Sequence, residues 1–194
     1  MMLRILALIS LFVAVSTANA HPGHSHDFSG AVETGIAHPW TGIDHLMAMV
    51  LVGVMATQSG LRRRWMLPAL FCGAMAVASV AGQAIGPIFR LDLGLAIALI
   101  ALGVCLVRRF HHAMLPAIVT LCGGLHGFAH GAGWGAGDVS MPYLAGMILG
   151  TTVLHLVGMG IGTAFNQTRS RSTWVRGTGT IACAVGVALL LGTV

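Results

Sequence analysis

Charge of either sign is scarce in this chain of 194 residues, which has no lysine, only five acidic residues and 8% charged residues in all. An ordinary soluble domain carries about 25% charged residues, so the composition excludes a typical water-soluble fold. A phosphate-binding loop of the GxxxxGK[ST] type is also missing, which excludes ATP coupling within the chain. The four cysteines lie in four separate apolar stretches without a CxxC pair, so we expect reduced thiols that pack as small apolar side chains.

Apolar residues make up 56% of the sequence and gather in long stretches. A helix needs about 20 such residues to cross the hydrocarbon layer of a bilayer. Six stretches meet this need, at residues 40–59, 66–86, 91–107, 113–132, 142–165 and 174–193. The sequence therefore predicts an all-α, polytopic membrane bundle of about six transmembrane helices, which forms a single domain over residues 21–194.

Two independent signals predict the topology of this bundle. Residues 1–20 have the pattern of a cleaved signal peptide, with Arg4, an apolar run and small residues at its end, so a mature N-terminus at His21 is expected outside. Eight arginines lie in the connections on one side of the predicted spans and only Arg90 on the other, and the positive-inside rule places the crowded side in the cytoplasm. Both signals predict an N-out, C-out protein of the cell (inner) membrane, with its mature N-terminus on the periplasmic or extracellular side. This asymmetry, rather than a nucleic-acid partner, explains the net charge of +5.

The chain has ten histidines, and five of them lie in or beside the predicted spans, where an ionisable side chain is costly and usually functional. Imidazole and carboxylate ligands suit nickel, cobalt, copper or zinc, so we expect these residues on the path of a divalent transition metal. The candidate metal ligands are His21, His24, His38, Asp44, His45, His126, His130 and His155.

The segment HPWTGIDHLMAM carries three of these candidates, His38, Asp44 and His45. Neighbouring helix residues point about 100° apart, so Asp44 and His45 can serve one ion directly only in a distorted helix. Asp44 can instead orient His45 through the second ring nitrogen, a common arrangement around metals. The alternative is a buried Asp–His pair that joins helices without a metal.

His126 and His130 stand four residues apart in HGFAHG, so both project from one helix face, where they could chelate one ion or simply pack. At a rise of about 1.5 Å per residue, this pair and the HPWTGIDH segment reach the same outer layer of the membrane, whereas His155 lies deeper. We expect His155 to be a second binding position, with a satisfied core histidine as the alternative. His21 and His24 are expected to capture the ion outside, or else belong to a tail with incidental metal affinity.

Glycines recur at four-residue spacing along several predicted spans. Small residues on one helix face let two membrane helices approach closely, so we expect packing seams at 82–86, 146–150 and 158–162. The series at residues 123, 127, 131 and 135 runs beside His126 and His130, and we expect it to leave room for an ion and a partner helix.

The segments HPWTGIDHLMAM, HGFAHG and LHLVGMGIG, in this order, resemble the HupE/UreJ family of membrane proteins associated with nickel-dependent hydrogenase and urease systems. The family motif HPxxGxDHxxxM is met in full, by His38, Pro39, Gly42, Asp44, His45 and Met49. The resemblance covers essentially the whole chain. It implies a secondary permease, not an enzyme, that takes up Ni²⁺ (or Co²⁺) as its substrate and has no tightly bound cofactor. It also implies a functional link to hydrogenase or urease maturation, and it is compatible with a homo-oligomeric protein.

Two other functions are compatible with the same residues. Histidine and aspartate at membrane depth also build zinc sites with an open position, which would make the chain an intramembrane zinc hydrolase with Asp44 in place of the usual glutamate base. The third hypothesis is a non-transporting metal-binding accessory protein for hydrogenase or urease maturation.

Overall fold

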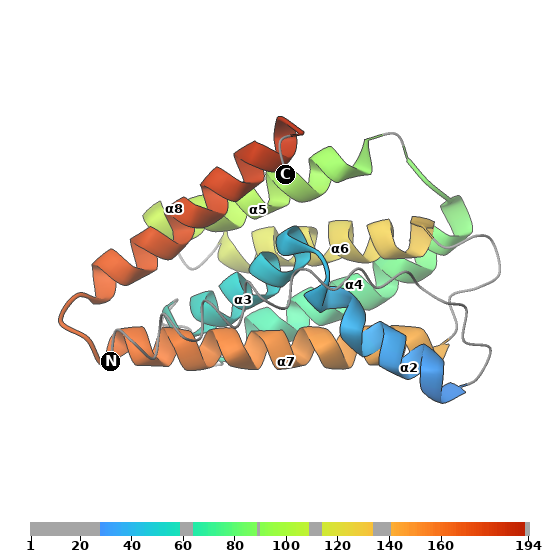
Figure 1. Cartoon of the computed structure of the whole chain (residues 1–194), viewed down its shortest axis with the longest axis horizontal. Coiled ribbons are helices and arrows are strands. Elements are labelled where there is room, and N and C mark those ends of the chain that lie inside the picture. Colours follow the sequence, from blue (N-terminus) through green and yellow to red (C-terminus); the bar gives the residue numbers. More distant parts are fainter. Residues whose placement is uncertain (1–27, 59–63, 89, 109–113, 134–140, 193–194) are drawn as a thin grey trace.

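The computed structural model describes residues 28–58, 64–88, 90–108, 114–133 and 141–192 (Figure 1). Over these residues the chain is helical and has no strand, so the predicted all-α class is confirmed. The elements are α2 (Phe28–Ala37), the short 3-10 helix η1 (His38–Trp40), α3 (Ile43–Gln58), α4 (Met66–Ile85), α5 (Leu91–Arg108), α6 (Leu115–Gly133), α7 (Met141–Asn166) and α8 (Arg171–Leu190). The signal peptide expected at residues 1–20, and the candidates His21 and His24, lie outside the described residues.

Four of these helices, α4, α5, α7 and α8, are long and apolar enough to cross a membrane. Helix α6 has 19 residues and is not among them, since two histidines lower its mean hydropathy, and α3 has only 16 residues. The bent pair Ser29–Thr41 and Ile43–Gln58 gives a fifth candidate if it counts as one span. The described part of the chain therefore supports four or five candidate spans, against the six that the sequence indicates.

The first expected span, residues 40–59, differs most from the structure. Helix α2 precedes it, and the chain bends by 85° before α3 begins. Two glycines, Glu33 and Thr34 interrupt the apolar pattern of α2, which is why the sequence does not predict a helix there. Figure 1 shows α2 beginning at the end of the bundle where α7 starts and α3 leading toward the opposite end, with η1 between them. The bend that carries His38 thus lies within the bundle.

Helix α7, with 26 residues, packs against both halves of this bent segment. Gly146 and Gly150 lie against the backbone of α2, whereas Gly158 and Gly162 lie against α3. A Cβ atom at any of these glycines would collide with the facing helix. The packing seams expected at 146–150 and 158–162 are confirmed, and they hold the two halves of the bent segment in place.

A second seam joins α4 and α6 and fixes the rotation of α6. Its members on α6 are Gly123, Gly127 and Gly131, and they lie against the backbone of successive turns of α4, at Phe71, Met75 and Ser79. Gly82 adds a contact from α4 to the backbone of Phe128. Because these glycines occupy one face of α6, the neighbouring face with His126 and His130 turns toward η1 and α3.

The prediction that Gly86 belongs to a packing seam is wrong, because Gly86 ends α4 with φ of 83° and none of the described residues lies within 4 Å of an ideal Cβ there. Only glycine adopts this conformation at little cost. Gly135, the last glycine of the expected series on α6, lies outside the described residues.

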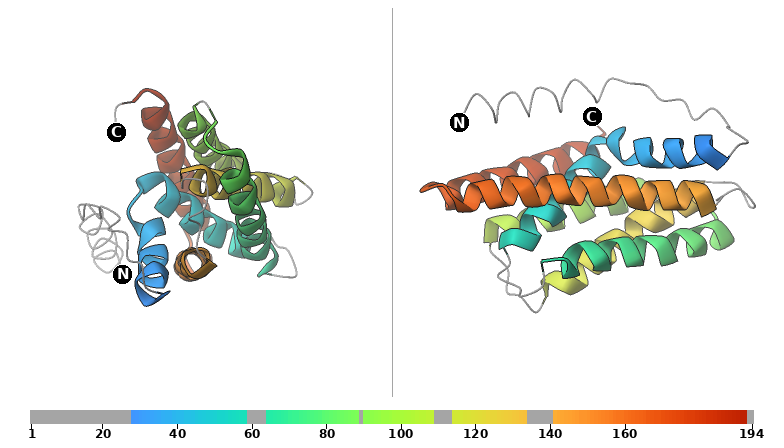
Figure 2. Two further views of the ribbon diagram at one scale, coloured as in Figure 1. Left: turned by 90° about the vertical axis from the view of Figure 1, so that its right-hand side faces the viewer. Right: turned by 90° about the horizontal axis from the view of Figure 1, so that it is seen from below.

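Helices α5 and α8 form a third close pair, side by side along one edge of the bundle (Figure 2). Gly103 of α5 lies against Gly179 and Cys183 of α8. Large apolar side chains point outward on several helices, among them Val77 (74% exposed), Leu121 (65%) and Ile181 (60%). Such faces fit a lipid environment, where outward apolar side chains carry no cost of hydration.

Replacement of Gly127 by alanine tests the α4–α6 seam. Its Cβ would collide with the carbonyl oxygen of Met75, so α4 and α6 must separate. Overpacking of this kind costs about 1–3 kcal/mol, so we expect a lower thermal unfolding midpoint for the purified protein in detergent.

Gly124→Ala is the matched control on the same helix, since no atom of the residues that the structure describes lies within 4 Å of a Cβ there. We expect its unfolding midpoint to equal or exceed that of the wild type, because alanine favours a helix more than glycine does. Equal midpoints for the two variants would contradict the seam.

Candidate metal centre

The bend between α2 and α3 is built from η1 and the two residues after it. Pro39 lies in the first turn of η1, where its missing N–H leaves no hydrogen bond unmade. The carbonyl of His38 accepts hydrogen bonds from the amide (3.1 Å) and the hydroxyl (2.8 Å) of Thr41, which closes the turn. At Gly42, a Cβ would lie 2.7 Å from Asp44 Oδ1 and 3.0 Å from His45 Nδ1. Glycine at residue 42 therefore leaves the space that these two side chains occupy.

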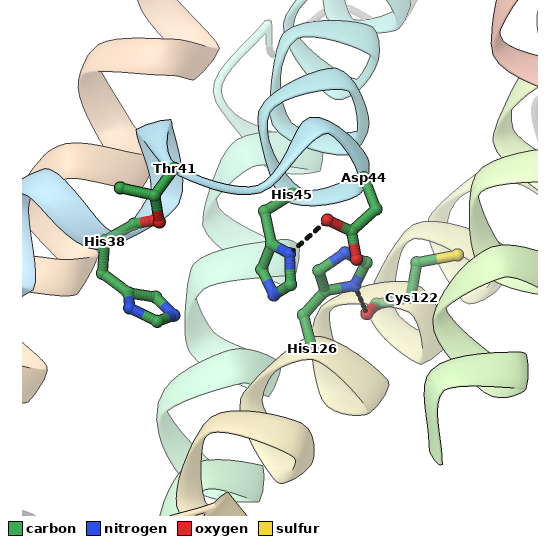
Figure 3. A network of polar contacts seen from close by, with 6 residues as sticks. All are labelled: His38, Thr41, Asp44, His45, Cys122 and His126. Carbon is green, nitrogen blue, oxygen red and sulfur yellow. Dashed lines mark hydrogen bonds and ion pairs between the residues drawn. The ribbon is translucent and has the colours of Figure 1, made fainter. Parts of the chain in front are cut away.

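Asp44 and His45 form a pair in the first turn of α3 (Figure 3). His45 Nδ1 donates a hydrogen bond to Asp44 Oδ1 at 2.7 Å. This bond orients the imidazole and leaves Nε2 with its lone pair, the arrangement that a carboxylate imposes on metal-binding histidines. The hydrogen bond lies within one helix, whereas the His45 ring contacts His126 and His130 of α6, so the arrangement also fits the alternative of a pair that joins helices without a metal.

His126 and His130 project from the last two turns of α6 toward this pair. His126 Nδ1 donates to the carbonyl of Cys122 at 2.8 Å, which leaves Nε2 as an acceptor. Both side chains are buried, with 0% and 7% exposed, and neither Nε2 atom has a hydrogen-bond partner among the described residues. A buried polar atom without a partner costs about 1–3 kcal/mol, so a ligand for these nitrogens is the expected explanation.

Three histidines from three elements meet at the bend. His38 of η1, His45 of α3 and His130 of α6 each offer a ring nitrogen, and these atoms lie within 4.8 Å of one another. The ring centroid of His130 is 4.6 Å from that of His38 and 4.8 Å from that of His45. We name these three residues the histidine cluster. His126 adjoins it, with its ring 5.1 Å from that of His45.

The donor set of the histidine cluster suits a borderline divalent ion. Imidazole nitrogens bind nickel, cobalt, copper and zinc, whereas magnesium and calcium prefer oxygen ligands. The carboxylate of Asp44, hydrogen-bonded to His45, adds a negative charge beside the rings, which favours a cation. The geometry can therefore hold a divalent transition metal through nitrogen ligands.

His155 stands apart from the histidine cluster. It is 1% exposed on α7 and its ring centroid lies 5.3 Å from that of Phe71, with the planes at 89°. Phe71 also contacts His126, at 5.5 Å between centroids, so one aromatic ring touches both histidines. The structure thus brings together five of the candidates predicted from the sequence, keeps His155 separate, and does not describe His21 and His24.

Two neighbours of the histidines were not predicted from the sequence. Phe71 was one apolar residue among many, and no local pattern marks it. Tyr143, 2% exposed and 6.0 Å from His38 between ring centroids, could have been noticed as the only tyrosine of the chain. Both come from helices distant in sequence, so only the packing of α4 and α7 shows their position.

The HupE / UreJ protein family model matches residues 9–189 of the chain. The chain belongs to the HupE/UreJ family. It is 31% identical over 193 residues to Protein HupE of Rhizobium leguminosarum bv. viciae, which covers 97% of this chain and 98% of that relative. No solved structure matches the chain.

The HupE/UreJ family is associated with nickel or cobalt uptake or with an accessory role, linked to hydrogenase and urease. Membership and the apolar helices together make the chain a multi-pass membrane protein. The motif that carried the resemblance in the sequence is the segment that forms the bend and two members of the histidine cluster.

Replacement of Asp44 by asparagine tests the role of the carboxylate. Asparagine keeps the size but loses the charge that orients His45 and attracts a cation. Loss of such a supporting partner typically costs about 10–100-fold in metal affinity, so we expect weaker binding of Ni²⁺ by this factor, measured by calorimetric titration of the purified protein.

Glu33→Gln serves as the control, because it removes the same charge from an exposed position on α2. We expect its affinity for Ni²⁺ to equal that of the wild type. Unchanged affinity in Asp44→Asn would show that the carboxylate does not support the cluster.

Proposed function

We propose that this HupE/UreJ protein is a secondary permease that takes up a divalent transition metal ion, nickel in the first place and cobalt as the second choice. The observation that carries the proposal is the histidine cluster at the bend, where ring nitrogens of His38, His45 and His130 lie within 4.8 Å of one another. The ion is the substrate, and its ligands come from the intramembrane histidines.

The bent first segment supports transport rather than simple storage. Transporters often place ion sites where a membrane helix is interrupted, since irregular backbone at membrane depth occurs where it is buried in protein or lines a cavity. Here the interruption follows α2, and the two residues of the Asp44–His45 pair begin the next helix. A site at such an interruption draws its ligands from both parts of the segment, here His38 from η1 and His45 from α3.

The membrane potential is sufficient to drive uptake. Moving one charge inward gains about 2.3 kcal/mol per 100 mV, so a divalent ion gains about 4.6 kcal/mol. This gain needs no ATP, in keeping with the missing phosphate-binding loop.

The proposal retains the topology that the sequence predicts. Residues 1–20 act as a cleaved signal peptide, and six spans in the inner membrane leave both mature termini outside. In this arrangement α2 and α3 together make the first span and α6 makes the fourth. His21 and His24 then lie on the side from which the ion arrives.

The zinc hydrolase is the alternative that one observation favours, because three imidazoles with room for a further ligand also describe a catalytic zinc site. However, the carboxylate of Asp44 is hydrogen-bonded to His45, so it is not available as the general base that activates water.

An accessory protein that binds metal without moving it would keep the histidine cluster but need no path through the bundle.

Uptake by vesicles tests the proposal. Purified protein is reconstituted into liposomes that contain a nickel-sensitive dye, and Ni²⁺ is added outside with an inward-directed potential. We expect dye quenching that falls about tenfold or more in His45→Ala and His130→Ala, since the loss of a ligand should cost at least as much as the loss of its supporting partner.

His112→Ala is the control, because this histidine lies in the sequence between two predicted spans and outside the candidate ligands. It should transport as the wild type does. Vesicles of wild-type protein that bind Ni²⁺ without quenching the enclosed dye would support the accessory role instead, and unchanged uptake in both cluster variants would overturn the proposed site.

A further inference from the structure

A second group of potential ligands lies beyond Phe71, away from the histidine cluster. Cys72 of α4 and His155 of α7 face each other, with 3.9 Å between Cys72 Sγ and His155 Nδ1. His155 is 1% exposed, and its Nε2 has no hydrogen-bond partner among the described residues. Cys72 is half-buried and forms no disulfide. A thiol and an imidazole thus meet inside the bundle through a long, weak hydrogen bond, which an ion shared by the sulfur and Nδ1 would replace.

Phe71 contacts a histidine of each group. Its ring centroid lies 5.5 Å from that of His126, which adjoins the histidine cluster, and 5.3 Å from that of His155. The backbone of His155 lies against Gly53, eight residues after His45, which is about 12 Å along α3. Among the described residues, the three ring nitrogens close enough to share one ion are those of His38, His45 and His130, so the Cys72–His155 pair forms a group of its own.

The distance between the two donors fits a shared ion. Metal–sulfur and metal–imidazole bonds are about 2.3 Å and 2.0–2.1 Å in tetrahedral zinc sites, which separates the two donor atoms by roughly 3.6 Å. The observed 3.9 Å needs only a small rotation of either side chain. On binding, the thiol of Cys72 would release its proton to solvent and the sulfur would bind as thiolate.

The surroundings of the pair are soft and polar rather than purely apolar. One turn before His155 on α7, the hydroxyl of Thr151 contacts the sulfur atoms of Met49 (3.3 Å) and Met75 (3.9 Å). Thioether sulfur is a weak ligand for borderline and soft ions and not for magnesium or calcium. Two thioether sulfurs thus lie within one helical turn of His155, around the Thr151 hydroxyl.

The other thiols have different contacts. Cys122 donates to the carbonyl of Ala98 at 3.7 Å and Cys183 to that of Ile100 at 3.6 Å. These are weak bonds to helix backbone, the usual behaviour of a packing cysteine. Cys72 is the thiol that the described residues place against an imidazole.

We propose that Cys72 and His155 form a second binding position for a borderline divalent transition ion, with one thiolate and one imidazole ligand. As a second position of the transported ion, this proposal rests on the permease function, and an ion would reach it from the histidine cluster past the ring of Phe71. The sulfur ligand would also favour nickel, cobalt or zinc over manganese and magnesium.

Titration of the purified full-length protein with Co²⁺ in detergent tests the site directly, because a thiolate bound to Co²⁺ gives a near-ultraviolet charge-transfer band that imidazole ligands do not give. We expect this band in the wild type and in a variant that keeps Cys72 as its single cysteine, with Cys105, Cys122 and Cys183 changed to serine. We expect its loss in Cys72→Ser and in His155→Ala, and its retention in Cys183→Ser.

The single-cysteine variant keeps Cys72. A band in this variant therefore assigns the bound thiolate to Cys72, even if the Cys72→Ser variant does not fold. Absence of the band in the wild type, or its persistence in Cys72→Ser, overturns the second position. The two proposals can fail separately. If vesicles take up Ni²⁺ but the purified protein gives no band, the permease function stands and the Cys72–His155 site is wrong. If the band appears but vesicles take up no Ni²⁺, the site stands and the permease function is wrong.

Discussion

Burying a polar nitrogen without a hydrogen-bond partner costs free energy, and in the described part of the chain His126, His130 and His155 each bury such an Nε2 atom. A core built only for packing would fill these positions with apolar side chains of similar size. An ion that binds these nitrogens for part of the time would explain this cost. Nitrogens that already form hydrogen bonds within the protein would not be free to bind a metal ion. The glycine seams and the bend are the features of the bundle that hold these rings close together.

Two devices bring the rings together. The glycine seam between α4 and α6 places the two backbones in contact and turns His126 and His130 toward the bend. The bend itself lets His38 and His45, seven residues apart, approach the same point from η1 and from α3. A continuous helix would place residues seven apart two turns from each other, about 10 Å along the axis, and His130 could not reach both. The interruption is therefore a requirement of the cluster.

The sequence predicts the arrangement of the candidate ligands better than it predicts the course of the backbone. The His-x-x-x-His spacing at 126 and 130 and the Asp44–His45 neighbours indicate a shared helix face and an oriented ring, and both are found in the structure. Helix α2 could not be predicted because Glu33 and its glycines hide the apolar pattern, and its stability comes from contacts with α7. The sequence does not single out Phe71, and it predicts that Cys72 packs as a small apolar side chain, because an apolar run carries no sign of which residue will face a histidine on another helix. Whether the histidines bind metal stays a prediction.

X-ray absorption at the nickel edge, on the purified protein loaded with Ni²⁺, tests the central claim most directly. The account predicts a nearest shell that contains nitrogen with the outer-shell scattering of imidazole rings from the histidine cluster. It also predicts that this scattering weakens in His38→Ala and in His130→Ala, which change residues on different elements. A shell of oxygen ligands without imidazole scattering, identical in the wild type and both variants, would contradict it.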